Sequence, residues 1–324
     1  QEETEVSGEE QPENQTEVTD KDSEKVNLTL ELLPAEEPVN ANVIIQTVDE
    51  FVALSKSEAQ TYQDKTITLA PHDTAEWDLS GTGFAGLGSD AYPFKGEIGF
   101  SGEYTGYITL DKSLFNAISS DAKINSTLNL RAADNMTDPI LAKSYVAGEN
   151  ADLSSQTIHL NIDAESKAAT EEKDKYSSFG GIIGTLGKDA SVSLDVISII
   201  PTAETVVSGE GNKGFFCNTM EESASLMLTG FTGSADFNVT STDQSAGALV
   251  GYMAANANLT VGTEFAYSGS VTGAQNAGGL VGGTKAGAQI ILQGNYTVSG
   301  SITSGNGNVG GLIGLAENNP VSIM

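Results

Sequence analysis

Residues 276–305 read NAGGLVGGTKAGAQIILQGNYTVSGSITSG, and residues 306–324 start the same pattern again as NGNVGGLIGLAENNPVSIM. In both segments two large aliphatic residues stand between glycines, and the first segment holds one charged residue, Lys285. Self-similarity at a fixed period is typical of solenoids and related repeat proteins, in which each repeat stacks on the next. The two segments therefore predict a repeat architecture.

The motif recurs through most of the chain. Its first large apolar residue is expected at Leu114, Ile140, Ile182, Phe215, Leu249, Leu280 and Leu312. The last five positions are 33, 34, 31 and 32 residues apart, whereas the step before Ile182 is 42 residues long. That longer step contains the charged run AESKAATEEKDKYSS, which we expect to form an inserted loop. The chain is thus predicted to repeat a unit of about 32 residues.

Each unit is expected to hold three short strands, the first of them in the motif. The second is predicted in KINSTLNL, QTIHLNI, ASVSLDV, ASLMLTG, ANLTVGT and AQIILQG, and the third in DFNVTS, FAYSGSVTG and NYTVSGSITS. Three strands joined by turns rich in Gly, Asn and Ser fit one coil of a parallel β-helix, with about 4.8 Å between coils. Leucine-rich repeats have shorter periods and propeller blades have four strands, so both fit less well.

We therefore predict an all-β fold, a right-handed parallel β-helix of about seven coils over residues 91–324. Glycine suits the motif because it reaches the backbone angles of a sharp corner and lets stacked coils approach closely. The last unit ends just inside its second strand, and no C-terminal cap, sorting motif or anchor is visible. The β-helix is therefore expected to be truncated, with an open edge at its last coil.

Residues 27–90 are predicted to form a small α/β cap on the first coil. The segment from Thr47 to Glu50 has the form of a capping box, in which the hydroxyl accepts a backbone N–H and the glutamate reaches back. Phe51 belongs to the apolar face of the helix that follows, and this helix should end near Ser57–Gln60. Strands are expected in KTITLAP and WDLSGTG. Such a cap would cover backbone groups that the first coil otherwise exposes.

The charge of the chain limits its partners. The formal net charge is −29, with 44 acidic and 15 basic residues, and Arg131 is the only arginine. Such a composition disfavours binding to nucleic acid and to anionic membrane surfaces. Residues 1–26 hold many acidic residues and little to bury, so we predict a disordered acidic tail. No run reaches the roughly 18 apolar residues of a membrane span, so direct membrane insertion is not expected.

The location of the protein is inferred from the same features. The chain opens without a signal peptide, and its acidic start is typical of what remains after one has been removed. We therefore expect an extracellular or cell-wall-associated protein. The single Cys217 excludes an intramolecular disulfide and a cysteine-cluster zinc site. In its segment, KGFFC, it is expected to be a buried structural thiol.

Few residues carry the marks of catalysis. Gly81–Gly86, Gly209–Gly214 and Gly305–Gly310 match GxGxxG, but none is expected to open a helix, so they predict turns and not a nucleotide site. His72 and His159 are the only histidines, and the HEXXH motif is absent. His159 is expected to face outward on a strand, and a weak cation site beside His72 is a minor alternative. No catalytic residue, cofactor or metal is assigned.

Aromatic residues gather near the N-terminal end of the sequence. Trp77, Tyr92, Tyr104 and Tyr107 are candidate binding residues, because aromatic side chains can stack on sugars or anchor a protein partner. The alternative is that they pack the cap against the first coil.

The segments GGIIG, GALVG, GGLVG and GGLIG resemble the GLUG-motif family, named for Gly-Leu-any-Gly. This motif occurs in repetitive surface proteins of Firmicutes and in the non-catalytic region of streptococcal-type IgA-cleaving metallopeptidases. The resemblance is carried by Gly181, Ile182, Gly184, Leu249, Gly251, Gly279, Leu280, Gly282, Gly311, Leu312 and Gly314. At Gly214–Cys217 the last glycine is lost. The leader, TVDEFVALSKSEAQTYQDKTITLAP followed by YPFKGEIGFSGEYTGYITL, is also similar to that family, so the resemblance covers about residues 43–324.

The resemblance implies a cell-surface module without a reaction of its own. We expect adhesin-like binding of a host glycan, a mucin or an immunoglobulin, with a structural stalk or spacer as the alternative and a polysaccharide-degrading enzyme as a more distant one. A continuous exposed aromatic or apolar strip along one face would favour the binding module. Uniform faces of Thr, Ser and Asn would favour the spacer.

Overall fold

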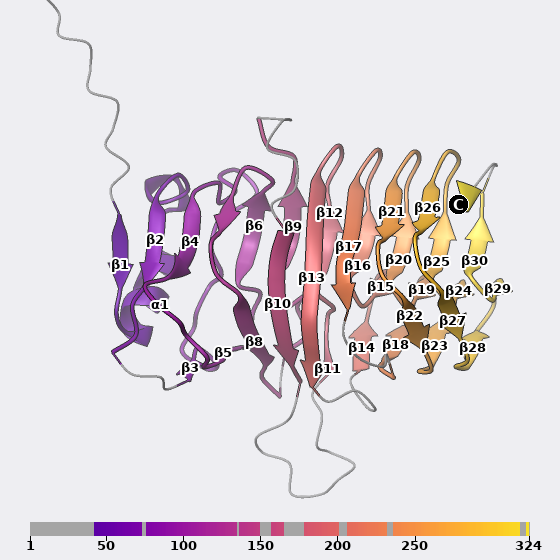
Figure 1. Ribbon diagram of the computed structural model, residues 1–324, viewed down its shortest axis with the longest axis horizontal. Coiled ribbons are helices and arrows are strands. Elements are labelled where there is room, and N and C mark those ends of the chain that lie inside the picture. Colours follow the sequence, from indigo (N-terminus) through magenta and orange to yellow (C-terminus); the bar gives the residue numbers. More distant parts are fainter. Residues whose placement is uncertain are drawn as a thin grey trace, which may run out of the picture. The chain divides into compact units, whose positions relative to one another are not determined.

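The computed structural model describes residues 42–72, 76–134, 136–149, 157–164, 178–200, 206–231, 236–317 and 322–323. The predicted acidic tail and most of the predicted inserted loop lie outside these residues. Strands of the described part stack in parallel as a β-solenoid of about seven turns, with one short helix near its N-terminal end (Figure 1). The predicted parallel β-solenoid is therefore confirmed.

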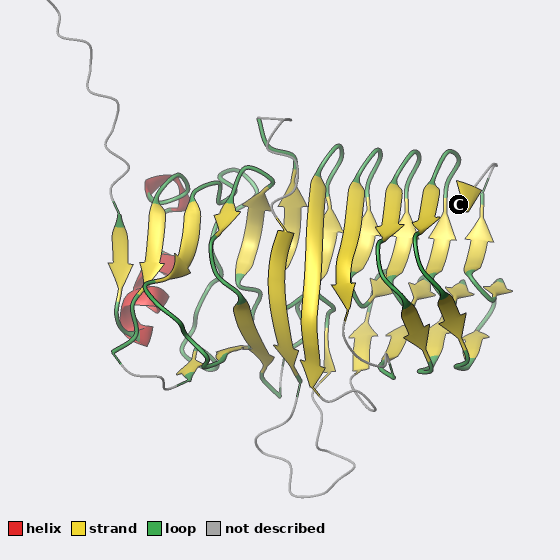
Figure 2. Ribbon diagram, in the orientation of Figure 1, coloured by secondary structure: helices red, strands yellow, loops and turns green. Residues whose placement is uncertain are grey.

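Two long sheets run along the solenoid (Figure 2). The sheet that we name the long sheet contains β3 (Trp77–Asp78), β5 (Ile108–Leu110), β8 (Leu128–Ala132), β10 (Thr157–Asp163), β13 (Ser191–Ile200), β17 (Ser225–Phe231), β21 (Asn258–Val261), β26 (Gln289–Leu292) and β31 (Ser322–Ile323). The motif sheet contains β6 (Phe115–Ser119), β9 (Ala142–Val146), β12 (Ile183–Leu186), β16 (Cys217–Met220), β20 (Val250–Met253), β25 (Val281–Thr284) and β30 (Ile313–Ala316).

Shorter sheets complete the coils. The third sheet contains β11 (Ser178–Phe179), β14 (Val206–Gly209), β18 (Asn238–Ser241), β23 (Val271–Gly273) and β28 (Ile302–Ser304). The corner sheet contains β15 (Lys213–Gly214), β19 (Ala246–Gly247), β24 (Ala277–Gly278) and β29 (Val309–Gly310), and β22 (Phe265–Tyr267) pairs with β27 (Tyr296–Val298). The N-terminal sheet contains β1 (Val43–Ile45), β2 (Thr66–Leu69), β4 (Glu97–Phe100) and β7 (Lys123–Ile124).

The predicted second strands are confirmed, because all six segments contribute to the long sheet. Each later unit was expected to hold a single strand after the second one, and this prediction is wrong. There FAYSGSVTG forms β22 and β23, and NYTVSGSITS forms β27 and β28. Gly269 lies between the first pair, where a side chain would overlap the carbonyl oxygen of Phe237 in the coil before. Close approach between the backbones of successive coils therefore requires glycine between the two strands.

The motif alignment is wrong by one residue in two units. Strand register pairs Cys217 with Ile183 on one side and with Val250 on the other, so the residue equivalent to Leu249 is Phe216 and not Phe215. By the same register Ala142 pairs with Ile183, which makes Leu141 the equivalent residue in place of Ile140. Two adjacent large apolar residues stand in each of these units, and the sequence alone cannot tell which one faces which neighbour.

Close backbone approach explains most of the motif glycines. Short corner strands cross next to the motif sheet, so a methyl group at Gly247 or Gly278 would overlap the carbonyl oxygen of Val250 or Val281, respectively. Of the glycines that carry the resemblance to the GLUG motif, only Gly181 has a positive φ, at 92°. The expectation that these glycines serve sharp corners is therefore wrong for the rest, and close stacking is the reason that holds for all of them except Gly311.

The sharp corners lie elsewhere, in the turns from the motif sheet to the long sheet. Asp189, Ser223 and Asn256 each have φ of 59°, and Gly287 has φ of 76°. The backbone N–H of each residue except Gly287 donates to a carbonyl of the equivalent turn in the next coil, at 3.0–3.1 Å. The same left-handed backbone conformation thus recurs in this turn of four successive coils, at an Asp, a Ser, an Asn and a Gly.

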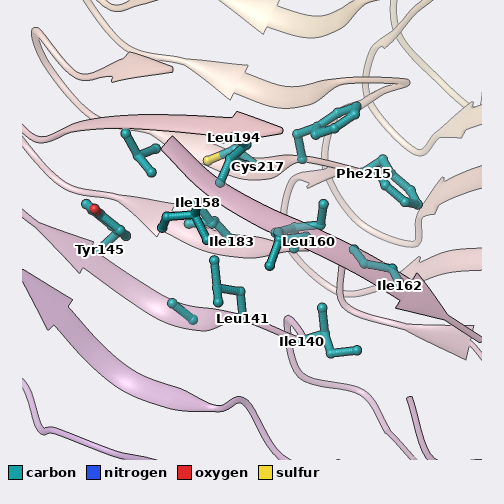
Figure 3. Close-up of a cluster of buried hydrophobic side chains, with 14 of the residues drawn as sticks. Ile140, Leu141, Tyr145, Ile158, Leu160, Ile162, Ile183, Leu194, Phe215 and Cys217 are labelled. Atoms are coloured by element: carbon teal, nitrogen blue, oxygen red, sulfur yellow. The ribbon is translucent and has the colours of Figure 1, made fainter. Parts of the chain in front are cut away.

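The core is a continuous column of aliphatic and aromatic side chains. On the long sheet Val192, Leu226, Leu259 and Ile290 lie in register on successive strands, each at most 1% exposed. Figure 3 shows a section of the core in which Leu160 and Leu194 of the long sheet lie near residues of the motif sheet such as Cys217. Burying one such side chain contributes about 2 kcal/mol to folding, so the column stabilises every coil through its neighbours.

The helix α1 (Val48–Lys56) is formed and capped as predicted. Thr47 Oγ1 accepts the Glu50 N–H at 3.2 Å, and the Glu50 carboxylate accepts the Thr47 N–H at 3.2 Å, which completes the capping box. Phe51 is fully buried, with its ring 5.1 Å from that of Phe84 and 6.0 Å from that of Trp77. The helix is therefore fastened to the first coils by aromatic packing.

Candidate functional site

Short polar side chains cover the outer faces of the later coils. On the third sheet Thr240, Thr272 and Thr303 occupy one register position on successive strands, and the hydroxyls of Thr272 and Thr303 lie 3.0 Å apart. Where coils meet at the corner sheet, the Asn276 amide donates to Ser245 Oγ at 3.0 Å, and the Asn308 amide donates to Asn276 Oδ1 at 3.0 Å. The threonines thus lie in register on an outer face, whereas Ser245 and Asn276 are buried and link the coils from inside the corner.

Large exposed apolar side chains are few and do not form a strip in the described ranges. They are Ile44, Tyr92, Ile197, Met227, Val309, Leu312 and Ile323. Val309 and Ile323 lie on strands that end their sheets, as does Ile44 on β1. The described faces therefore lack the continuous apolar strip that was expected of a binding face running along the solenoid.

The four candidate aromatics occupy different environments. Trp77 is buried against Phe51, so it packs the helix onto the coils. Tyr107 is half-buried beneath the guanidinium of Arg131, which lies 4.7 Å from the ring centroid. Tyr92 is exposed, and Tyr104 is half-buried against another ring. The structure therefore places Trp77 and Tyr107 in packing roles and leaves Tyr104 and Tyr92 accessible.

Tyr104 stacks on Phe100, a residue that the sequence pattern did not single out. The ring centroids lie 4.3 Å apart with 24° between the planes. The two rings line a cavity of about 250 Å³ whose other walls are Pro71, His72, Ser101, Gly102 and Glu103. This pocket, which we name the Phe100–Tyr104 pocket, combines an aromatic wall with hydroxyl, imidazole and carboxylate groups. Such a combination is typical of small-molecule sites.

A second cavity has a volume of about 270 Å³. Lys95, Asp121 and Glu149 contribute to its lining. Lys95 forms an ion pair with Asp64 at 3.3 Å, and the Asp121 carboxylate accepts the Glu149 backbone N–H at 2.7 Å. These charged groups are engaged in holding neighbouring turns together.

The only arginine of the chain serves the fold. Arg131 Nη2 lies 2.6 Å from the carboxylate of Asp163, and Nη1 contacts the carboxylate of Glu76. Asp163 is 2% exposed. Burial, and then the charge of Asp163, raise the pKa of the adjacent Tyr107. Since the guanidinium has two carboxylate partners, it is not available to bind an acidic ligand.

Neither histidine lies in a metal cluster. His159 is exposed on β10, as expected, and its Nδ1 lies 2.8 Å from the carboxylate of Asp195 on the next strand. His72 is exposed and lines the Phe100–Tyr104 pocket. Among the residues that the structure describes, no group of three or more His, Cys, Asp and Glu side chains could hold a metal ion.

The other sequence signals have structural roles. The glycines of Gly81–Gly86 and the first two of Gly209–Gly214 have positive φ, and none of the three GxGxxG matches opens a helix. Cys217 is fully buried, and burial raises the pKa of its thiol to about 12. Within the described ranges, no helix combines the length and hydropathy that a membrane crossing needs.

Comparison of the chain with protein-family models, with curated proteins and with solved structures found no match. The parallel β-solenoid is established by the strand pairing itself. Membership of the GLUG-motif family stays a hypothesis that rests on the motif residues.

Proposed function

We propose that this chain is a non-catalytic, extracellular or cell-wall-associated β-solenoid that acts as a spacer and holds other groups apart. The observation that carries the proposal is the polar outer surface of the later coils, where threonines lie in register on successive strands and no apolar strip runs along the described strands. The resemblance to repeat proteins of bacterial surfaces supports the location. No catalytic residue or cofactor is assigned.

A spacer must be stiff and inert, and the coils offer both properties. Stiffness comes from the continuous core and from parallel pairing of each coil with the next. Inertness comes from short side chains that already bond to one another. From Ala246 to Glu317 the chain holds only three charged residues, Glu264, Lys285 and Glu317, so stacked coils repel each other little.

A second candidate function is adhesin-like binding of a host glycan, a mucin or an immunoglobulin. The observation that favours it is the Phe100–Tyr104 pocket, which offers an accessible aromatic wall beside polar groups. This feature lies in the N-terminal coils and not on the repeat faces. The two functions can therefore coexist in one chain, with the later coils as the spacer.

The spacer proposal is tested by changing the repeat faces. A variant with Thr240, Thr272 and Thr303 each replaced by Lys alters one outer ladder without touching the core. We expect the variant to fold as the original chain does and to leave binding to a panel of host glycans, mucins and immunoglobulins unchanged. Immunolabelling of intact source cells should detect the chain at the surface. The spacer function would be contradicted by a member of the panel that binds the original chain but does not bind the variant.

A further inference from the structure

The Phe100–Tyr104 pocket lies where two neighbouring parallel strands end. β2 and β4 pair with Leu69 opposite Phe100, so the residues that follow both strands emerge at the same edge of the sheet. Pro71 and His72 follow β2, and the segment 101–104 follows β4. The Ser101 N–H donates to the Leu69 carbonyl at 2.9 Å. The two walls of the pocket are therefore joined by backbone hydrogen bonding and do not depend on side chains alone.

Buried polar groups hold the aromatic wall in place from below. The Asn129 side chain belongs to a residue 8% exposed, and its amide donates to the Gly106 carbonyl at 3.1 Å and to the Tyr104 carbonyl at 3.5 Å. Asn129 is fixed in turn, because its Oδ1 accepts the Asn161 amide at 2.8 Å. A wall that is already ordered loses less conformational entropy when a ligand binds.

The chemistry of the lining points to one class of ligand. Because Phe100 and Tyr104 stack on each other, each ring keeps one face turned away from its partner. Such a free aromatic face is flat and apolar, which suits the C–H face of a sugar ring. The pocket is also lined by residues whose side chains complement hydroxyls: the Ser101 hydroxyl donates and accepts hydrogen bonds, the His72 imidazole offers two ring nitrogens, and the Glu103 carboxylate accepts hydrogen bonds. A ligand that is apolar on one face and rich in hydroxyls at its edge matches this arrangement.

Size and charge narrow the class further. The cavity of about 250 Å³ is smaller than the roughly 300–1,000 Å³ of sites for drug-sized ligands, so it fits one ring and not a chain of rings. Glu103 at the pocket and a net charge of −29 disfavour acidic ligands. We propose that the Phe100–Tyr104 pocket binds one neutral pyranose ring, stacked on the aromatic wall. This inference goes beyond the spacer function and is independent of it.

The test uses the full chain and neutral methyl hexopyranosides of the gluco, galacto and manno series as probes, with binding followed by saturation-transfer NMR titration. We expect saturable binding of at least one of them, and at least tenfold weaker binding of the matching uronic acid. Tyr104→Ala should weaken binding at least tenfold. Tyr92→Ala, at an exposed tyrosine outside the pocket, should change it less than twofold.

A second variant is needed because Tyr104→Ala could also weaken binding by disturbing the fold. Among the described residues, and apart from the two chain neighbours of Gly102, no atom lies within 4 Å of a Cβ placed on it, so Gly102→Trp attaches a bulky side chain at the pocket with room for its first carbon. It should also weaken binding at least tenfold, with circular dichroism unchanged. The proposal is overturned if no probe binds saturably, or if Gly102→Trp binds as the original chain does. Either result leaves the spacer proposal standing, because that proposal is tested on the threonine ladder.

Discussion

The guanidinium of Arg131 and the carboxylate of Asp163 lie opposite each other on adjacent strands β8 and β10, with 2.6 Å between Nη2 and Oδ2 and 2.8 Å between Nε and Oδ2. The pair is largely buried, and Glu76 and Tyr107 flank the guanidinium. Removal of Asp163 takes away two charge-assisted hydrogen bonds in a poorly hydrated place and leaves the guanidinium with Glu76 as its remaining carboxylate partner. The pair therefore ties two coils together.

Asp163→Ala should lower the free energy of unfolding of these coils by about 3 kcal/mol. The measurement is urea unfolding followed by the fluorescence of Trp77, the only tryptophan, whose strand pairs with β5 and through it with β8. The double variant Arg131→Met/Asp163→Leu should recover much of the loss. Lys188→Ala, which breaks an exposed ion pair with Glu222, is the control and should cause no measurable change. A loss of similar size in the control would contradict the argument.

Two equivalent motif glycines should respond differently to the same substitution. A methyl group at Gly279 would overlap the carbonyl oxygen of Gly311, whereas no atom of the described residues, other than those of its chain neighbours, lies within 4 Å of a methyl group at Gly311. We expect Gly279→Ala to cost about 1–3 kcal/mol, as overpacking does. Gly311→Ala should be neutral or stabilise by up to about 1 kcal/mol. Thermal unfolding of the two variants side by side gives the comparison, and equal melting temperatures would show that close stacking is not what requires glycine.

The sequence predicts the fold well because its signals are local or periodic. The capping box at Thr47 needs only four residues, and the repeated strands need only the recurrence of one pattern. The strand register is harder to predict from the sequence. Phe215 and Phe216 are equally apolar, and only pairing with the neighbouring coils determines which of them is equivalent to Leu249. Phe215 occupies the place that Gly279 takes in a later coil, and its ring stacks on that of Phe237 at 4.0 Å.

The Phe100–Tyr104 pocket is only partly predictable from the sequence, for a related reason. Tyr104 stood out as an aromatic residue, but Phe100 had the pattern of a strand residue. Their stacking depends on how the loop after β4 folds back, which is fixed by Asn129 on a later strand. A pattern along the chain does not contain that long-range contact.

The stacked corner offers a stabilising substitution. Ser223 has φ of 59°, a conformation that costs a residue with a side chain about 1–2 kcal/mol, and its hydroxyl makes no hydrogen bond within the described structure. Ser223→Gly should therefore stabilise the chain by about 0.5–1 kcal/mol once the greater freedom of glycine in the unfolded state is counted. Gly287→Ala is the opposite change at the equivalent corner and should destabilise. Scanning calorimetry of both variants tests the sign of each effect.

The helix should depend on Phe51. This side chain is fully buried between Phe84 and Trp77, so Phe51→Asp would bury a carboxylate without a partner. We expect loss of at least about 3 kcal/mol, a shift of the Trp77 emission to longer wavelength, and aggregation on size-exclusion chromatography. Ala53→Asp, at an exposed position of the same helix, should change none of these. A soluble and equally stable Phe51→Asp variant would refute the role of the helix as a cover.

Cys217 makes the stability of the chain sensitive to alkaline pH. Burial raises the pKa of its thiol from the ordinary 9.0 to about 12, so the unfolded chain releases this proton at lower pH than the folded chain does. The unfolded state then binds fewer protons, and stability falls as pH rises. The stability that the neutral thiol of Cys217 contributes is fully present below about pH 9 and is lost progressively between about pH 9 and 12.

Two measurements check this prediction. A thiol reagent at pH 8 should label Cys217 only after denaturation, because the folded chain holds the thiol buried and protonated. Buried tyrosines such as Tyr145 and Tyr267 have raised pKa values as well, so the cysteine must be isolated by comparison with Cys217→Ala. That variant should be less stable than the original chain at pH 7, since it loses core packing, and the difference should shrink as the pH rises above about 9. Labelling of the folded chain at pH 8, or a difference independent of pH, would show that the thiol is not held in its neutral form.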